Sequence, residues 1–241
     1  HAIMKELMVC LEVYRSPKGL SKQIPVEVVD SWLDSFPDTL TCLDFSDCVL
    51  ALGAMLHVPK TLKEFATACT TLKLLPLETS LETFKWYPPK LVNLGLLVPM
   101  PSLTHLEVPT GILSWTSDRH APKHLFPSLT YLHLEEAILT TESMRCLPDT
   151  ITYLHVGNAT SSDVLLDYLP PNLLTLRWHQ NRGYPPPNMA QFPRTLETIE
   201  LSGSTLGIPI FLSEIPPKLT SLDVHAFTAG LLLTPISDLP S

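Results

Sequence analysis

The sequence predicts an α/β solenoid, in which short coils stack so that their strands form one parallel sheet. Short helices or 3-10 turns are expected on the side opposite the sheet. Three observations lead to this prediction. One motif recurs along most of the chain, its spacing is about 22 residues, and the frequent prolines fall at the same place in each unit.

The motif reads apolar-Pro-x-x-Leu-x-x-Leu-x-Leu, with other large apolar residues accepted at the leucine positions. Clear copies occupy 147–156, 169–178, 192–201, 215–224 and 36–45, a weaker copy begins at Val58, and shortened copies begin at Met100 and Phe126. The first leucine-type positions, which we call anchors, are Leu40, Leu62, Leu81, Leu103, Leu129, Ile151, Leu173, Leu196 and Leu219. A degenerate unit near Met8 brings the expectation to about 9–10 repeats.

Alternating leucines point to one face of a short strand, which a single strand cannot bury. Stacking the units pairs the strands in parallel and builds one continuous apolar core. A second leucine follows most anchors ten residues later, at Leu50, Leu72, Leu91, Leu113, Leu139 and Leu206. Leu91 is therefore expected in the later part of the coil that begins at Leu81.

The chain has 24 prolines and only 9 glycines. Proline ends a helix and biases the preceding residue toward an extended conformation. Short helix-like stretches at 28–33, 143–146 and 163–168 each precede a motif proline. The prolines are therefore interpreted as the points where the chain leaves the convex side to begin a strand, and not as ligands for proline-binding domains.

The pattern resembles the leucine-rich repeat, L-x-x-L-x-L-x-x-N/C-x-L, from Phe36 to Ser241. The Asn/Cys position is kept only at Cys48 and Asn181, with Ser204 a substitute, so the resemblance implies an irregular horseshoe with a concave sheet. The apolar-Pro opening is also similar to amoebal FNIP-type and bacterial-effector repeats, although the FNIP signature residues are absent. Residues 1–35 are expected to be a degenerate repeat or flank, and 36–241 a solenoid truncated at its C-terminus.

The charge and the residue composition limit the classes of function that the chain can have. The net charge is −8, and the 16 Lys and Arg residues form no run, which argues against nucleic-acid binding. No apolar window is long enough to insert in a membrane. Five cysteines without a CxxC pair suggest buried free thiols and favour a cytoplasmic location. The chain begins at His1 without a signal segment, so a fragment of a longer protein is expected.

When the anchor is counted as the first position, the third, fifth and seventh positions of each motif are expected to face the concave surface. Tyr131 and Tyr153 then lie on neighbouring strands, and aromatic and Arg side chains on a rigid face are common binding anchors. The alternative is a row of solvated strand positions with good β propensity. The candidate binding residues are Tyr131, His133, Tyr153, His155, Arg177, His179, Glu200, His105 and Glu107.

The interval from Leu103 to Leu129 is the longest and predicts an insertion loop that contains Trp115 and Arg119. Trp115 either contacts a partner or packs over the convex core. Asn158-Ala159-Thr160 is an N-glycosylation pattern just after a predicted strand, which matters only if the parent protein is secreted.

His133 and His155 could share a metal ion, with Glu135 or His105 as a further ligand. No dedicated spacing supports such a site, so the sequence favours a solvated histidine row, with no metal and no cofactor. Catalysis is not expected either, because the chain has no G-x-S-x-G, P-loop, HExxH or dinucleotide-binding motif.

The sequence therefore predicts a non-catalytic module that binds a protein partner, with an oligomeric state that it does not reveal. Three alternatives stay open. The chain could be the substrate-recognition part of a ubiquitin-ligase-like or effector protein, an ectodomain fragment with paired cysteines that binds an extracellular ligand, or a structural repeat in a large assembly.

Overall fold

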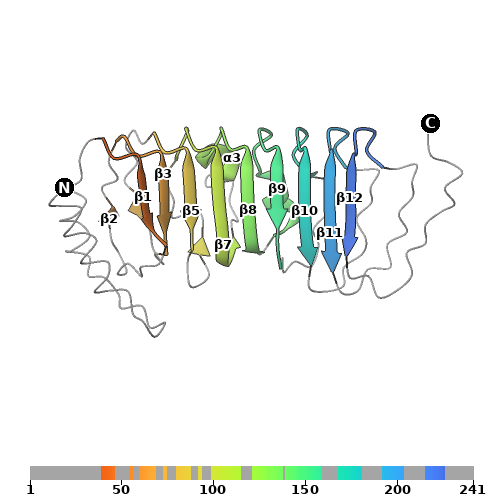
Figure 1. The fold of residues 1–241 in the computed structure, drawn as a ribbon, viewed down its shortest axis with the longest axis horizontal. Helices are drawn as coiled ribbons and strands as arrows, with labels where there is room; N and C mark the ends of the chain where they lie inside the picture. Colours follow the sequence, from red (N-terminus) through yellow and green to blue (C-terminus); the bar gives the residue numbers. More distant parts are fainter. Residues whose placement is uncertain are drawn as a thin grey trace, which may run out of the picture.

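The computed structural model describes residues 39–46, 55–56, 60–68, 73–74, 80–87, 92–93, 99–114, 121–137, 139–158, 168–180, 192–203 and 215–225. A main parallel sheet extends through most of these ranges, from 42–45 to 221–225 (Figure 1). Nine of its strands follow one another in chain order: β1 (Cys42–Phe45), β3 (Glu64–Thr67), β5 (Thr83–Trp86), β7 (His105–Ser114), β8 (Tyr131–Ala137), β9 (Tyr153–Val156), β10 (Thr175–Gln180), β11 (Thr198–Gly203) and β12 (Ser221–His225).

Because each strand is parallel to the next, the chain must return between strands to the end of the sheet where every strand begins. Each return completes one coil. The structure is therefore a solenoid of stacked coils, as predicted. The register also agrees with the repeat alignment, since Cys42 pairs with Glu64, His105 with Tyr131, and Tyr131 with Tyr153. The anchors lie in the core, and those that are no more than 1% exposed are Leu62, Leu81, Leu103, Leu129, Ile151, Leu173 and Leu196.

The motif prolines form a tight turn before β9, β10, β11 and β12. In the coil that leads to β9, the Ile151 N–H donates to the Pro148 carbonyl, which lies three residues earlier, at 3.3 Å. The Leu173–Pro170 and Leu219–Pro216 bonds repeat this turn at 3.1 and 3.0 Å. The prolines thus mark the starts of strands, in agreement with the interpretation of the sequence.

Hydroxyl groups connect these turns from coil to coil. The Thr150 hydroxyl donates to the Leu129 carbonyl of the preceding coil at 2.7 Å, and the Thr195 hydroxyl donates to the Leu173 carbonyl at the same distance. The Thr130 hydroxyl donates similarly to the Thr104 carbonyl at 3.0 Å. Threonine and serine thus supply links between coils, which the sequence analysis did not anticipate.

The predicted α/β class is wrong for the described part of the chain, which is a parallel β-solenoid with few helices. Beyond the main strands, β2 (Met55–Leu56) pairs with β4 (Lys73–Leu74), and β6 (Val92–Asn93) pairs with the end of β7. Short strands thus occupy positions where helices were expected, because extended chain continues the pairing between coils and tolerates proline nearby.

Two short helices lie within the described ranges. Helix α3 (Pro122–Leu125) lies behind the main sheet, and α4 (Thr141–Arg145) matches the stretch expected at 143–146 (Figure 1). The stretch expected at 28–33 lies outside the described residues, as does Leu91, and of the stretch expected at 163–168 only Tyr168 is described. Neither helix is long and apolar enough to cross a membrane.

The buried side of the sheet changes in character along the solenoid. At its N-terminal end the core is aromatic, because the Phe65 and Phe84 rings stack 5.8 Å apart and Phe84 stacks on Trp86 at 5.9 Å. In β7, β8 and β9 the equivalent residues are aliphatic, with Leu106, Leu132 and Leu154 forming the layer behind the strands, whereas β10 again buries an aromatic residue, Trp178.

Candidate functional site

The outer face is the side of the main sheet opposite this core, and it carries the third, fifth and seventh residues of each motif. Side chains alternate between the two sides because a strand has a two-residue period. In β9, Leu154 and Val156 are buried, whereas Tyr153 and His155 are only partly buried. The register therefore brings equivalent outer-face residues from neighbouring coils directly beside one another.

A row of stacked rings occupies the third position of three neighbouring strands. The His105 and Tyr131 ring centroids are 3.8 Å apart, and those of Tyr131 and Tyr153 are 4.2 Å apart, with each pair of rings nearly parallel. The Arg177 guanidinium continues the row at 6.0 Å from the Tyr153 ring. Burial, with a hydrogen bond to Tyr153, raises the pKa of Tyr131 to about 12, so its hydroxyl stays protonated at neutral pH.

A second row, made of imidazoles, runs beside the first. The His133 and His155 rings stack at 4.1 Å, and His179 lies 5.0 Å from His155 at a tilted angle. Burial, followed by the neighbouring His133 and His179, lowers the pKa of His155 to about 4. Burial also lowers the pKa of His105, although Glu107 opposes that shift. His155 is therefore neutral at physiological pH.

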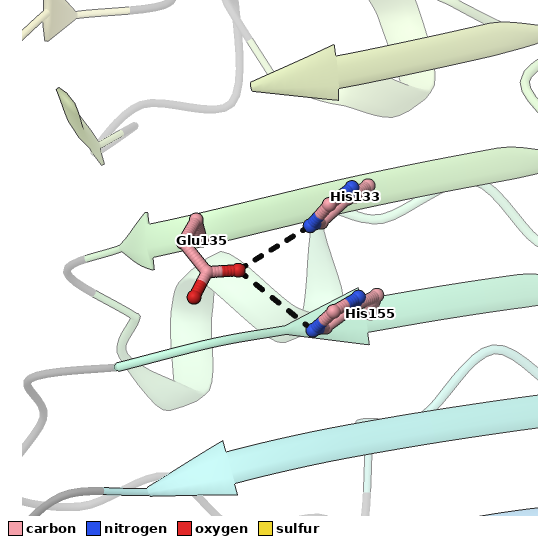
Figure 2. A group of neighbouring side chains, drawn as sticks. All are labelled: His133, Glu135 and His155. Atoms are coloured by element: carbon pink, nitrogen blue, oxygen red, sulfur yellow. Dashed lines mark hydrogen bonds and ion pairs between the residues drawn. The ribbon is translucent and has the colours of Figure 1, made fainter. Parts of the chain in front are cut away.

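Three glutamates lie beside these basic groups. Figure 2 shows Glu135 next to the two stacked histidines, with its Oε2 atom 3.4 Å from Nε2 of His133 and 3.9 Å from Nε2 of His155. Glu107 lies 3.6 Å from Nδ1 of His133 and 3.3 Å from the Lys85 ammonium. This proximity of Glu107 raises the pKa of Lys85.

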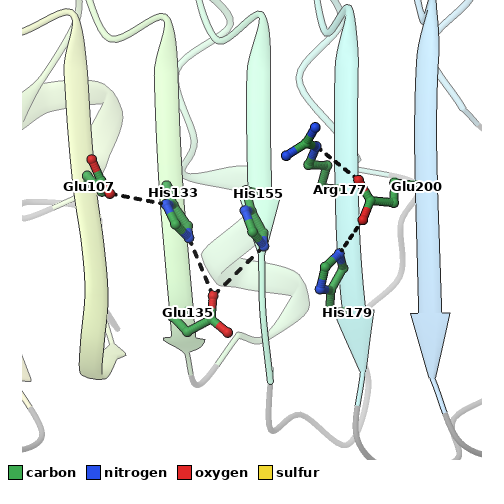
Figure 3. A network of polar contacts seen from close by, with 7 residues as sticks. All are labelled: Glu107, His133, Glu135, His155, Arg177, His179 and Glu200. Carbon is green, nitrogen blue, oxygen red and sulfur yellow. Dashed lines mark hydrogen bonds and ion pairs between the residues drawn. The ribbon is translucent and has the colours of Figure 1, made fainter. Parts of the chain in front are cut away.

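Glu200 completes the network on the neighbouring strands. Its carboxylate forms an ion pair with Arg177, with Oε2 3.0 Å from Nε, and its Oε1 lies 3.1 Å from Nε2 of His179 (Figure 3). Acidic and basic groups thus alternate across β7 to β11, and this part of the outer face presents a chemically mixed surface instead of a field of one sign.

The structure brings together the nine residues predicted as candidates for binding. All lie on the outer face of β7, β8, β9, β10 and β11, in the order of the repeat. The insertion-loop candidates Trp115 and Arg119 lie outside the described residues. Asn158, the glycosylation candidate, lies two residues after the end of β9 and has a positive φ of 48°.

Glu135 and Gly157 were missing from that set. They occupy the seventh position of neighbouring units, and a Cβ on Gly157 would lie only 2.7 Å from the Glu135 carboxylate. Gly157 therefore makes room for the carboxylate beside the two histidines. The signal in the sequence was that a glycine and a long acidic residue hold the same position in neighbouring units of the repeat alignment.

The expectation of buried thiols is met in one of two cases. Cys146 is buried and Cys42 is exposed, whereas Cys10, Cys48 and Cys69 lie outside the described residues. The expectation is wrong for Cys42 because it occupies the third motif position, which faces outward. Partial burial, followed by the charges of Glu64 and Asp44, raises the pKa of this thiol.

Comparisons with models of protein families, with characterised proteins and with solved structures gave no match for the chain. The geometry of the outer face is therefore the basis for inferring function.

Proposed function

We propose that the chain is a non-catalytic protein-binding module, and that its partner contacts the outer face around Tyr131, Tyr153 and Arg177. The observation that carries this proposal is the continuous stack from His105 through the two tyrosines to Arg177. Tyrosine and arginine are enriched among the residues that dominate binding energy at interfaces. Neighbouring rings already order these side chains, so a partner loses less entropy in fixing them.

We also infer that the coils are leucine-rich repeats, with the outer face as the concave surface. In-register leucines on parallel strands and the buried anchors support this relationship. The β-rich opposite side is the departure from the usual repeat. In solenoids of this kind the extended concave surface is the usual place for a macromolecular ligand.

The paired charges indicate what kind of contact the face makes. Arg177 and His179 share Glu200, and Lys85 faces Glu107, so the basic groups here already have acidic partners. Such a surface recognises a partner through ring contacts and matched hydrogen bonds more than through long-range attraction. Because the whole chain carries a charge of −8, a polyanionic nucleic acid does not suit it.

The test compares two triple variants on the same face. The first changes Tyr131, Tyr153 and Arg177 to alanine, and the control changes Glu64, Thr83 and Ser221, which hold the third position in other coils. Partners are isolated on the intact chain, and their affinity for each variant is then measured. We expect a loss of more than about 30-fold for the first variant, as for contact residues that contribute about 2 kcal/mol or more.

The control triple should bind within a few-fold of the intact chain, and circular dichroism should match for all three proteins. Retained affinity in the Tyr131, Tyr153 and Arg177 variant would contradict the proposal. Absence of any specific partner would favour the structural-repeat alternative.

A further inference from the structure

Two histidines and a glutamate converge on the outer face at β8 and β9. His133 and Glu135 are two residues apart on β8, so they point to the same side, and His155 is the in-register neighbour of His133 on β9. One ligand atom from each of the three residues lies within 4.8 Å of the others, and among the residues that the structure describes this is the one such group.

We propose that His133, Glu135 and His155 form a binding site for a late divalent transition-metal ion such as Zn²⁺. The Nε2 atoms of both histidines face the same carboxylate oxygen of Glu135, at 3.4 and 3.9 Å (Figure 2). Donors bound to one tetrahedral zinc ion lie about 3.3 Å apart, given bonds of about 2.0–2.2 Å. The two rings are parallel, with 7° between their planes, so binding of one ion requires them to turn out of the stack until both Nε2 lone pairs point at it.

His155 supplies an independent observation. Its Nε2 atom is the one buried side-chain nitrogen or oxygen, within the described part of the chain, that has no hydrogen-bond partner. Such unsatisfied polar atoms are rare because each costs free energy. The Glu135 oxygen at 3.9 Å is too far away to accept a hydrogen bond, whereas a metal ion between the two atoms would satisfy both.

The surroundings also suit a metal centre. The Glu135 carboxylate lies over Gly157, where any larger residue would displace it, since a Cβ would come within 2.7 Å. On the far side of His133, the Glu107 carboxylate faces Nδ1 at 3.6 Å. A carboxylate behind a metal-bound histidine fixes the orientation of the ring and makes its other nitrogen a better ligand.

The donor set determines the class of ion. Imidazole nitrogens suit zinc, copper, nickel and iron, whereas Ca²⁺ and Mg²⁺ require shells of mostly oxygen ligands. Two imidazoles and one carboxylate leave a coordination position open toward the solvent side, because Glu135 is 38% exposed. Water or a donor from another molecule would occupy that position. This structure-based inference replaces the sequence-based expectation of no metal.

The test uses the full chain, stripped of metals by dialysis against a chelator. Zn²⁺ is titrated in competition with a chromophoric chelator, and Co²⁺ is titrated to record its absorption spectrum. The variants are His155→Ala, Glu135→Gln and Gly157→Ala, of which the last removes no ligand and only displaces the carboxylate. The matched control is His225→Ala, because His225 pairs with Asp223 at 2.8 Å on the same face without a third ligand.

We expect one tightly bound ion per chain, at least tenfold weaker binding in each of the three site variants, and binding within twofold of the intact chain in the His225 control. Circular dichroism checks that the variants are folded. No Zn²⁺ binding by the intact chain, or equal binding by the His155 variant, would overturn the proposal. Weaker binding in the His155 variant alone, with Glu135→Gln and Gly157→Ala unchanged, would overturn the three-ligand site.

Discussion

Two ladders of rings lie on opposite sides of the same sheet. In β3 and β5 the in-register rings of Phe65 and Phe84 stack in the core, and Phe45 of β1 meets Phe65 edge to face from a different motif position. The outer side of those strands carries small or charged residues around a small hollow. In β7, β8 and β9 the arrangement is reversed, with leucines in the core and the rings of His105, Tyr131 and Tyr153 outside.

The repeat determines that equivalent residues stack, and it leaves open which side of the sheet carries the rings. Register stacks equivalent residues of neighbouring coils on both sides of the sheet, so either ladder forms once rings recur at one motif position. On the buried side, rings contribute to stability by removing apolar area from water. On the outer side, half-buried rings contribute less to stability and remain accessible to a ligand.

The largest expected effect is on the buried ladder. Phe84→Ala should lower the free energy of unfolding by about 3–5 kcal/mol, because Phe84 is fully buried and stacks on both Phe65 and Trp86. Thr83→Ala, on the outer side of the same strand, is the control and should cost far less. Chemical denaturation measures both, and similar losses would show that the two sides do not differ as described.

The next effect is a pH dependence on the outer side. His155 has a pKa of about 4 in the folded chain, against an ordinary value near 6.5 when unfolded. The unfolded chain binds more protons between these values, so the stability that His155 contributes is present above pH 6.5 and is lost as the pH falls toward 4. The slope is at most about 1.4 kcal/mol per pH unit, reduced by solvent screening.

Denaturation at several pH values, in the presence of a chelator, measures this slope. His155→Gln should flatten the curve between pH 6.5 and 4, while His225→Gln, at an exposed position, should leave it unchanged. An identical slope in the His155 variant would show that this imidazole is not desolvated in the folded chain.

A smaller effect is expected at the turns between coils. Thr150→Val keeps the side-chain shape but removes the hydroxyl that donates to the Leu129 carbonyl, at a cost of about 1 kcal/mol. Thr195→Val removes the same bond two coils further along the solenoid and should cost a similar amount. Thermal denaturation of both variants tests whether the hydroxyl links stabilise the coils, and unchanged melting temperatures would count against it.

The smallest expected effect on stability is in the outer ladder. Tyr131→Leu removes two ring stacks from a half-exposed position, and each aromatic pair contributes roughly 0.5–1.5 kcal/mol when well packed. We expect a loss of about 1 kcal/mol or less by chemical denaturation. A loss as large as that of Phe84→Ala would place Tyr131 in the structural core instead of on a binding face.

The repeat made the main sheet predictable from the sequence. Leucines at alternate positions of a 22-residue unit determine which side faces the core, so the pairing of Tyr131 with Tyr153 and of His133 with His155 follows from alignment alone. The segments between main strands were less predictable. A two-residue strand such as β2 or β6 has no periodicity by which it could be distinguished from a helical turn.

The sequence offered Glu135 and His105 as alternative neighbours of the two histidines and did not decide between them. The choice depends on the rotamer of one long side chain and on the space above Gly157, which motif positions do not specify. The hydroxyl links at Thr150 and Thr195 depend similarly on the geometry of the proline turn. The directions of these side chains could therefore be learned only from the structure.

A crosslinking map across the outer face tests the central claim that the partner contacts the ladder around Tyr131, Tyr153 and Arg177. A photoreactive residue is placed in turn at Thr175, beside Tyr153, at Glu64, which holds the equivalent position near the N-terminal end, and at Lys123 on α3. We predict crosslinks to one partner from Thr175, and few or none from Glu64 and Lys123. Equal or stronger crosslinking from Glu64 or Lys123 would contradict the account.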